Sequence, residues 1–532
     1  MGNDFEQLIG GAWLSQRYSF EPALPLATTS RIGGRRATQS NDGLSTETYV
    51  EAMRPEPTLR GHLTFHLKHE APNLELLSRL FECCPPDELT AWINSEPTGQ
   101  YARRAGFLYE WITGRELPVG AAISGPYIDA MDGEKMVVAT AGLALVNKRW
   151  RVRDNLPGTR AFCPVIRKAA AVAQAMALDI PALIHALAAE FGEDVLMKSA
   201  VWMTLRESKS SFEIEGEADK LDRIQRFADV LSRRTGGGAV PLDEASLAQL
   251  QSEILGRSTS LKGFGLRQSP VFVGETIRYQ DIVHYVAPAS DDVPAMLSGL
   301  QIFLTRTQGQ SPVMRSAVAA FGFVYIHPLA DGNGRVHRFL INDLLRRDGA
   351  VRAPMIVPVS ALITHDAAER RAYDDILDVV SKPLMRSVAG GYEFTPTPST
   401  YPDGINSNFV FHKNASARHA WQHLDLTRHV SYLSHVIERT IREDMREELR
   451  YLRSHARARS AIKDIIEMPD AQVDRVIRSM QANEGKLSNA LAKEVPALAR
   501  DGVWERLREL VRRAFEGERV GELVKETVVK KA

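Results

Sequence analysis

Residues 327–338 read HPLADGNGRVHR and form a short loop between two expected helices. The first helix is predicted over 312–326, because a serine followed by a proline opens it and Pro328 disfavours helical geometry at the residue before it. The second is predicted over about 335–348, because a Gly-Asn-Gly segment precedes it and a glycine follows it. The polar loop therefore lies at the junction of two helices.

The Gly332-Asn333-Gly334 segment indicates a binding site for an anion. Two glycines leave several backbone N–H groups free at the start of a helix, and such groups form a concave site that suits phosphate. Arg335 and Arg338 are three residues apart, so they share the helix face beside this site. A plain turn with a capping aspartate would explain the glycines, but it requires neither the histidine nor the two arginines.

Two further side chains of the loop suit phosphoryl or nucleotidyl transfer. Asp331 precedes the glycines, where a carboxylate can hold a divalent metal that bridges phosphate oxygens. His327 opens the loop, and an imidazole can take up a proton near neutral pH. A zinc site made of His327, Asp331 and His337 is disfavoured, because His337 lies on a different helix face from the arginines and no cysteine is near.

The loop closely resembles the Fic family motif, His-x-Phe-x-Asp-Gly-Asn-Gly-Arg-x-x-Arg. The match covers His327, Asp331, Gly332, Asn333, Gly334, Arg335 and Arg338. Leu329 takes the place of the usual Phe, which is an apolar anchor under the loop. The resemblance implies a mainly α fold, in which a Fic-type helical core carries a small β-hairpin flap and is accompanied by helical N-terminal and C-terminal parts.

A second motif, upstream of the loop, resembles the inhibitory motif of the same family, Ser/Thr-x-x-x-Glu-Gly/Asn. Ser211 and Glu215, followed by a glycine, fit it. In that family the glutamate pairs with the second arginine of the Fic motif, here Arg338, and blocks productive placement of the γ-phosphate. A carboxylate bonded to Arg338 would take the donors that orient a triphosphate. Local pattern alone allows another interpretation, a helix-capping box formed by Ser210 and Glu213.

Residues 264–275 are the strongest β-hairpin candidate in the chain. They resemble the Fic flap, whose exposed edge holds a target peptide by strand addition. The resemblance assigns four residues to the segment over the nucleotide: Val271, Phe272, Val273 and Gly274. It also places Tyr373 near the nucleotide base, and Ser381 where several members of the family have Asn.

Composition bounds the class of protein. The chain has 532 residues, so two or three domains are expected, and its 44% apolar and 25% charged residues are typical of a globular protein. Zero formal net charge argues against a dominant surface for nucleic acid or an anionic membrane. Three cysteines, two of them adjacent, suggest no disulfide framework. We find no signal-peptide pattern and no apolar run long enough to span a bilayer, so we expect a cytoplasmic protein.

Three regions are predicted along the chain. Residues 1–195 are expected to be mostly helical, with a flexible or irregular arm over 26–60. Residues 196–388 would form the Fic domain, including the inhibitory helix, the flap and the catalytic motif. A boundary rich in Gly and Pro, 389–408, would open a helical C-terminal accessory domain that covers 389–532.

The resemblance implies a protein adenylyltransferase that moves AMP from ATP, with Mg²⁺ as cofactor, to a Tyr, Thr or Ser hydroxyl of a target protein docked on the flap. His327 would act as the base, Asp331 would hold the metal, and Glu215 would inhibit the enzyme. Three alternatives stay open: another nucleotide or a phosphocholine donor, removal of AMP, and a non-catalytic regulator that binds a partner or DNA through its C-terminal helices. Association with further copies of the chain also stays open.

Overall fold

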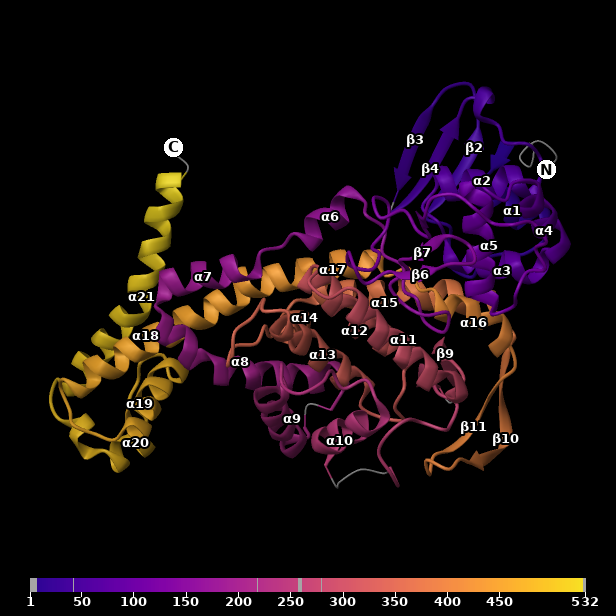
Figure 1. Ribbon diagram of the computed structural model, residues 1–532. Helices are drawn as coiled ribbons and strands as arrows, with labels where there is room; N and C mark the ends of the chain where they lie inside the picture. The colour runs from indigo at the N-terminus through magenta and orange to yellow at the C-terminus, as the bar shows by residue number, and fades with distance from the viewer. Residues whose placement is uncertain (1–6, 42, 218, 257–260, 279, 530–532) are drawn as a thin grey trace. The chain divides into compact units, whose positions relative to one another are not determined.

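The computed structural model describes residues 7–41, 43–217, 219–256, 261–278 and 280–529 (Figure 1). Residues 1–6, on which the signal-peptide expectation partly rests, lie outside these ranges. The chain divides into two compact units. The first comprises Met1–Leu178, Leu205–Ala353 and Val359–Ile437, and the second comprises Asp179–Thr204, Pro354–Pro358 and Glu438–Ala532.

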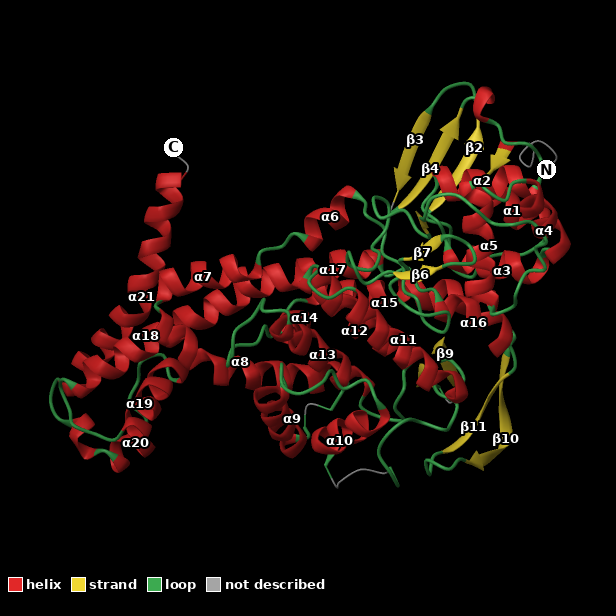
Figure 2. Ribbon diagram, viewed as in Figure 1, coloured by secondary structure: helices red, strands yellow, loops and turns green. Residues whose placement is uncertain are grey.

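Helices dominate both units, so the predicted mainly α class is confirmed (Figure 2). The helices of the first unit are α1 (Gly11–Arg17), α2 (Leu59–His69), α3 (Leu74–Cys83), α4 (Pro86–Ser95), α5 (Gln100–Thr113), α6 (Ala170–Met176), α9 (Leu221–Arg234), α10 (Glu244–Leu255), α11 (Val293–Arg306), α12 (Pro312–Ile326), α13 (Asn333–Arg347), α14 (Val359–His365), α15 (Ala367–Ser387), α16 (Asn414–Gln422) and α17 (Thr427–Arg439). Those of the second are α7 (Ile180–Phe191), α18 (Arg446–Lys463), α19 (Asp470–Ala482), α20 (Asn489–Glu494) and α21 (Val503–Val529). Helix α8 (Glu193–Ile214) contributes to both units.

No single helix within the described ranges is long and apolar enough to cross a membrane, although α6 and α7 together, as a bent pair, would meet the requirement of length and composition. The core of the second unit is formed by buried side chains of α18, α19, α20 and α21, among them Ile462, Val476, Leu491 and Leu507. A π-helical segment, Thr440–Met445, directly precedes α18.

The N-terminal part of the first unit contains a sheet where the sequence predicted an irregular arm. Strands β1 (Leu8–Ile9), β2 (Thr28–Ile32), β3 (Ala37–Asn41) and β4 (Leu44–Tyr49) form a sheet in the order β1-β2-β4-β3. The prediction of an irregular arm was wrong. It rested on the Ser and Thr content of these residues, whereas the strands are stabilised by pairing with one another. Strand β2, for example, pairs in parallel with β4 and antiparallel with β1. A three-stranded sheet, β5 (Ile128–Asp129), β7 (Val152–Asp154) and β6 (Leu145–Asn147), follows.

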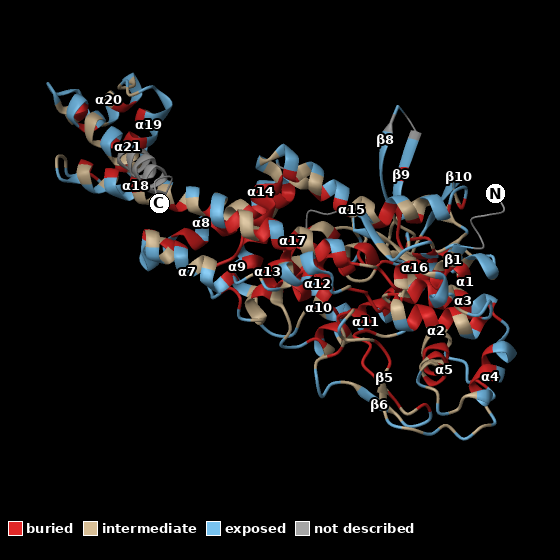
Figure 3. Ribbon diagram, turned by 90° about the horizontal axis from the view of Figure 1, so that it is seen from above, coloured by how far each residue is buried: buried red, intermediate tan, exposed pale blue. Residues whose placement is uncertain are grey.

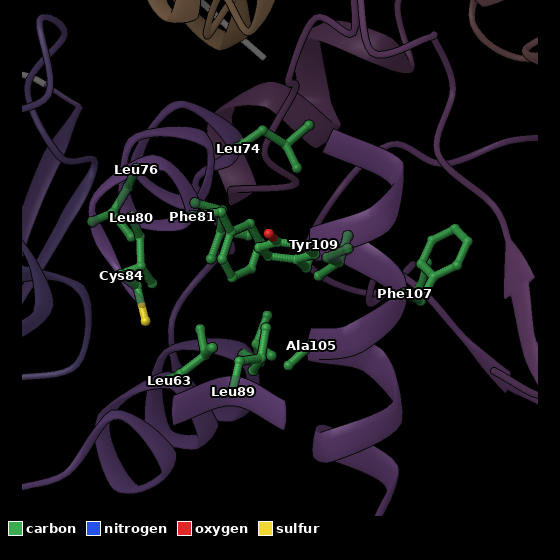
Figure 4. Close-up of a cluster of buried hydrophobic side chains, with 14 of the residues drawn as sticks. Leu63, Leu74, Leu76, Leu80, Phe81, Cys84, Leu89, Ala105, Phe107 and Tyr109 are labelled. Atoms are coloured by element: carbon green, nitrogen blue, oxygen red, sulfur yellow. The ribbon is translucent and has the colours of Figure 1, made fainter. Parts of the chain in front are cut away.

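An apolar core holds the N-terminal helices together (Figure 4). Leu74 and Phe81 of α3, Leu63 of α2 and Tyr109 of α5 are at most 3% exposed, and the rings of Phe81 and Tyr109 meet edge to face at 5.4 Å. Burial of this kind contributes roughly 1.5–3 kcal/mol for each large apolar side chain. This part of the unit therefore has a core of its own, apart from the helices that carry the motif.

Helices α12 and α13 form the centre of the first unit. Figure 3 colours both largely as buried, and the buried residues of α12 include nearly its whole length. Ser311 caps α12 as predicted, since its side chain accepts a hydrogen bond from the Met314 N–H. Helix α13 begins at Asn333, two residues before the predicted start, with Gly332 as its N-cap in the left-handed region at φ 94°.

Two β-hairpins belong to the same unit as α12 and α13; the sequence misplaced the first and did not predict the second. The predicted hairpin 264–275 is wrong in position, because the strands are β8 (Phe272–Ile277) and β9 (Gln280–Val286). The predicted boundary 389–408 instead contributes to a hairpin of β10 (Tyr392–Thr400) and β11 (Asn406–Phe411). The Phe272 ring packs on Phe394 and Phe409 of the second hairpin at 5.4 and 4.8 Å. This aromatic contact between distant segments accounts for an ordered hairpin in a sequence rich in Gly and Pro.

The compact units do not follow the predicted region boundaries. The hairpin β10–β11 and helices α16 and α17 belong to the same unit as α12 and α13. The continuous helical stretch that begins with α17 leaves this unit near Ile437. Residues 389–437 are therefore a structural part of the unit that contains the motif.

Candidate active site

The loop between α12 and α13 presents His327 to a cavity. His327 ends α12 in the left-handed region, at φ 51°. Asn333 fixes the loop by a double contact with Leu329: its Oδ1 accepts the Leu329 N–H at 3.0 Å, and its Nδ2 donates to the Leu329 carbonyl at 2.8 Å. Leu329 is fully buried, so it fills the apolar anchor position expected for Phe. Because its side chain is committed to the loop, Asn333 can offer an anion only its backbone.

His327 is suited to accept a proton. Its Nδ1 lies 3.2 Å from the Val324 carbonyl, so Nδ1 carries the proton when it donates to that oxygen, which leaves Nε2 as the free acceptor. Burial, followed by the positive charge of Arg267, lowers the pKa of His327 to about 4. The imidazole is therefore neutral near pH 7, the state that a general base requires.

Glu215 lies over the first turn of α13, where the sequence predicted an anion site. A Cβ atom at Gly334 would lie 2.0 Å from the Glu215 Oε1, so the missing side chain at Gly334 makes room for this carboxylate. Such close approach of an anion to a helix N-terminus is the behaviour expected of an anion-binding nest. The carboxylate thus occupies space beside the predicted phosphate site.

Arg338 pairs with both residues of the predicted inhibitory motif. Its Nε donates to the Ser211 Oγ at 2.7 Å, and its terminal nitrogen donates to the Ser211 carbonyl at 3.1 Å and to the Glu215 Oε1 at 2.5 Å. Burial acts to raise the pKa of Glu215, yet the charge and hydrogen bond of Arg338 hold it below its usual range. The capping-box interpretation of Ser210 and Glu213 is wrong, because α8 continues through both residues to Ile214.

Arg335 is held by a carboxylate that the sequence analysis did not single out. It donates to Glu217, and also to the Asp331 Oδ1 at 3.1 Å, while its guanidinium lies 4.7 Å from the Phe212 ring centroid. Its side chain is 3% exposed, whereas that of Glu217 is 28% exposed. Both motif arginines therefore contact carboxylates of one short segment, the residues that follow Phe212. The only sequence signal for Glu217 was its charge, two residues beyond the motif glutamate.

Asp331 fits the role of a magnesium ligand, because its side chain is 41% exposed next to the predicted phosphate site. Within the described residues, no group of three or more His, Cys, Asp or Glu side chains could hold a metal ion. Magnesium usually binds through one or two carboxylates together with phosphate and water, and a single aspartate suits that pattern.

A cavity of about 450 Å³ extends from the loop along one face of α15. Its lining includes His327, Gly334, Glu215, Val273, Tyr373 and Ser381, so six of the residues named from the sequence meet there.

The structure places Phe272 elsewhere, because its ring packs on β10 and β11, and Val271 lines a separate cavity of about 260 Å³. Gly274 allows the two strands of the hairpin to approach closely, since a Cβ there would lie 2.1 Å from the Ile282 carbonyl oxygen. Strand alternation explains why Val273 faces the 450 Å³ cavity and its neighbour Phe272 does not.

The model of the Fic/DOC family matches residues 241–345, a range that includes the whole loop. This part of the chain is similar to the Fic/DOC family. The match begins after Glu215 and Glu217 and ends before Tyr373, so neither the segment that carries the two glutamates nor α15 is part of it. The Fic/DOC match therefore supports the predicted Fic motif, whereas the contacts of the two glutamates with the motif arginines come from the structure alone.

Curated relatives of the chain carry the name protein adenylyltransferase Fic. The protein of this name from Aedes aegypti is 28% identical over an alignment of 193 residues, and the match covers 32% of this chain and 35% of the relative. That from Drosophila grimshawi is 32% identical over 114 residues, which are 21% of each chain. The chain thus spans between a fifth and about a third of the length of these relatives. A Fic family protein from Desulfovibrio desulfuricans G20 is similar in structure at 18% identity, with coverage of 63% of this chain and 94% of that one and a TM-score of 0.35.

Proposed function

We propose that the protein is an adenylyltransferase that moves AMP from ATP to a Tyr, Thr or Ser hydroxyl of a target protein. One observation carries the proposal: His327, neutral and with Nε2 free, lines the same cavity as Gly334 at the start of α13. A proton acceptor and an anion site within one cavity are what transfer from a nucleoside triphosphate requires. The relatives named protein adenylyltransferase support the same reaction.

Each motif residue has a defined part in this reaction. The target hydroxyl oxygen attacks the α-phosphorus, its proton passes to the His327 Nε2, and the bond from the α-phosphorus to the bridging oxygen breaks. The electron pair leaves with pyrophosphate, whose charge the backbone N–H groups at Gly334 and the Arg335 guanidinium stabilise. Asp331 would hold Mg²⁺, which neutralises phosphate charge when bound. Positioning and electrostatics supply most of the rate enhancement in such transfers.

The flap β8–β9 is proposed as the docking site of the target. The two strands form a sheet by themselves, so each has an edge that an extended peptide can join by main-chain hydrogen bonds. Val273 and Ile282, on opposite strands, are 42% and 40% exposed. Because Val273 also lines the nucleotide cavity, a peptide added to this hairpin would lie close to the attacking site.

We propose that Glu215 holds the enzyme in an inhibited state and that Glu217 acts in the same direction. Glu215 lies where a triphosphate would lie and accepts the hydrogen bond that Arg338 would donate to it. Glu217 likewise accepts a hydrogen bond that Arg335 would donate to a phosphate. Both carboxylates lie on one tethered segment, so their effective concentration at the arginines is high.

The last turns of α8 are anchored, because the buried Glu207 carboxylate accepts hydrogen bonds from the Ser360 N–H and hydroxyl at 2.8 and 2.6 Å. Activation would therefore move only the segment beyond Phe212.

The test uses ATP labelled at either the α- or the γ-phosphate. The Glu215→Gly protein is incubated with each ATP and with a mixture of candidate target proteins, with Glu215→Gly/His327→Ala as the matched control. We expect covalent label from α-labelled ATP alone, and no label in the control. Label from γ-labelled ATP would indicate a kinase, and no label from either would reject adenylylation. Competition by unlabelled GTP, CTP, UTP and CDP-choline identifies the donor.

A second candidate function is removal of AMP from a modified protein. The supporting observation is that the Glu215 carboxylate lines the same cavity as His327, where it could orient a water molecule for attack on phosphorus. An AMP-modified target incubated with wild-type protein would lose its AMP, and Glu215→Gly would abolish this loss. If Glu215→Gly only increases AMP attachment, the glutamate is inhibitory and removal is rejected.

A further inference from the structure

Arg267 is a buried arginine that bonds to backbone carbonyls. Its side chain is among the largest fully buried ones, and the residue is 2% exposed. Its guanidinium donates to the carbonyls of His327 at 2.7 Å, Pro288 at 2.6 Å and Ser269 at 3.1 Å. Its own backbone N–H donates to the Pro328 carbonyl at 2.9 Å. All these partners are main-chain oxygens.

The positions of these carbonyls connect two parts of the active site. Ser269 precedes the first flap strand and Pro288 follows the second, so two of the bonds close the base of the flap hairpin. His327 and Pro328 open the motif loop. One side chain thus joins the base of the proposed target-docking hairpin to the residue that carries the proposed base.

His327 needs such a restraint. A non-glycine residue in the left-handed region is strained and persists only where surrounding contacts hold it. Arg267 bonds to the carbonyl of this very residue, and a guanidinium presents its donors in a rigid plane. Burial of an arginine carries a desolvation cost, and burial lowers the pKa of Arg267 to about 10. Closure of a loop does not by itself require a buried charge, so this desolvation cost points to a further role for Arg267.

We propose that Arg267 is a positioning residue for the transfer reaction: it holds His327 in the left-handed turn that directs Nε2 into the cavity, and it keeps the flap in register with that base. The inference rests on the proposed function for its catalytic readout. It goes beyond that function because no part of the Fic motif includes Arg267.

Electrostatics adds a second effect that can be measured separately. After burial, the charge of Arg267 is the largest contribution that lowers the pKa of His327, and Glu215 acts in the opposite direction. The other charged or titratable side chains that line the cavity with His327 are Glu215, His284, Tyr285, Tyr325, Arg370, Tyr373, Asp374 and Asp378. Loss of the Arg267 charge should therefore raise the pKa of His327, while loss of its geometry alone should leave this pKa almost unchanged.

The experiment compares Arg267→Gln and Arg267→Lys in the Glu215→Gly background. Arg103→Gln is the matched control, because Arg103 is also a buried arginine, 1% exposed, that donates to the Pro126 carbonyl at 2.8 Å. We measure kcat and KM for AMP transfer, ATP affinity by calorimetry, and the His327 pKa by NMR titration. A misplacement of about 1 Å costs roughly a hundredfold in rate, so both Arg267 variants should lose roughly a hundredfold in kcat with ATP affinity within about threefold.

The two Arg267 variants separate geometry from charge. Arg267→Gln should raise the His327 pKa, whereas Arg267→Lys keeps the charge and should keep that pKa while kcat still falls. Equal losses of kcat and of melting temperature in Arg267→Gln and Arg103→Gln would overturn the inference, as would unchanged kcat in Arg267→Lys. If Arg267→Gln does not fold, the Arg267→Lys result decides by the same criteria. If the Glu215→Gly parent transfers no AMP, the proposed function fails, and the His327 pKa still tests the link to Arg267.

Discussion

Arg338 and Arg267 are both almost fully buried and both contact the active site, yet their partners differ in kind. Arg338 donates to the Glu215 carboxylate and to Ser211, and Arg267 donates to three backbone carbonyls. A carboxylate partner can be replaced by a phosphate, because both are anions with the same hydrogen-bonding requirement. Backbone carbonyls of the fold itself cannot be replaced. The comparison separates an exchangeable arginine, which can bind substrate, from a permanent one, which can only position.

The pKa values of the two arginines agree with this distinction. Burial acts to lower the pKa of Arg338, but the Glu215 carboxylate outweighs burial and raises it above its ordinary value. The Arg267 guanidinium donates to backbone carbonyls, and burial, against the opposing effects of Tyr285 and Asp403, lowers its pKa to about 10. Release of Glu215 would thus leave Arg338 as a buried cation that requires another anion, and ATP would supply one.

The largest effect is expected from His327, which Arg267 contacts and which is the proposed base. His327→Ala removes the proton acceptor, and loss of a general base costs roughly 10²–10⁴-fold in rate. ATP affinity should stay nearly unchanged, because the backbone donors at Gly334 remain. Transfer is followed with α-labelled ATP in the Glu215→Gly background, and ATP affinity by calorimetry. Transfer at the rate of the parent protein would show that His327 is not the base and that Arg267 does not act through this imidazole.

Removal of the carboxylate partner of Arg338 is expected to increase the rate of AMP transfer. Glu215→Gly should increase AMP transfer, mainly in kcat, because the displaced α-phosphate can then adopt the orientation for in-line attack. A charge-assisted pair is worth about 1.5–3 kcal/mol. Since the Glu215 side chain is 34% exposed, we expect the lower end of that range, roughly a tenfold gain. Equal or lower self-labelling than wild type would mean that the pair with Arg338 does not inhibit.

Glu217→Gln should have a smaller effect in the same direction. Its partner Arg335 keeps Asp331 after the substitution, and a partly exposed ion pair contributes about 0.2–1 kcal/mol, so a gain of at most about fivefold is expected. Glu213→Gln is the matched control, because Glu213 is an exposed carboxylate on the same segment. The double variant Glu215→Gly/Glu217→Gln shows whether the two pairs act independently. No difference between the Glu217→Gln and Glu213→Gln proteins would confine inhibition to the Arg338 side.

The smallest effect concerns pH. A base must be neutral, and the folded pKa of His327 is about 4, below its ordinary value of 6.5. Transfer should therefore be fully retained above pH 6.5 and lost only as the pH falls toward 4. Between pH 7.5 and 5.5 the rate of Glu215→Gly should change less than about twofold, whereas an ordinary histidine would lose about tenfold. A tenfold loss in this range would show that Arg267 and burial do not control this imidazole.

Local chemistry made the loop predictable from sequence. Proline after His327 ends α12, and glycines before Arg335 permit the left-handed turn that starts α13, so the helix-loop-helix geometry follows from short-range sterics. The order of residues along the loop also places the proposed base, the proposed metal ligand and the two arginines within twelve positions of the sequence. Glu215 was predicted to pair with Arg338 from a family resemblance, and the structure contains that pair.

Tertiary structure decided everything that depends on a distant partner. Ser- and Thr-rich segments form a sheet because β2 lies between β1 and β4, and a Pro-rich segment becomes β10 because aromatic rings of both hairpins pack together. The face of each flap residue followed from the actual position of β8, which the hairpin prediction missed by several residues. Glu217 and Arg267 gave no local signal, since an ion pair across 118 residues and a bond across 60 are created only when the chain folds. The sequence alone thus determined which polar side chains the loop presents, and packing determined which distant side chains contact them.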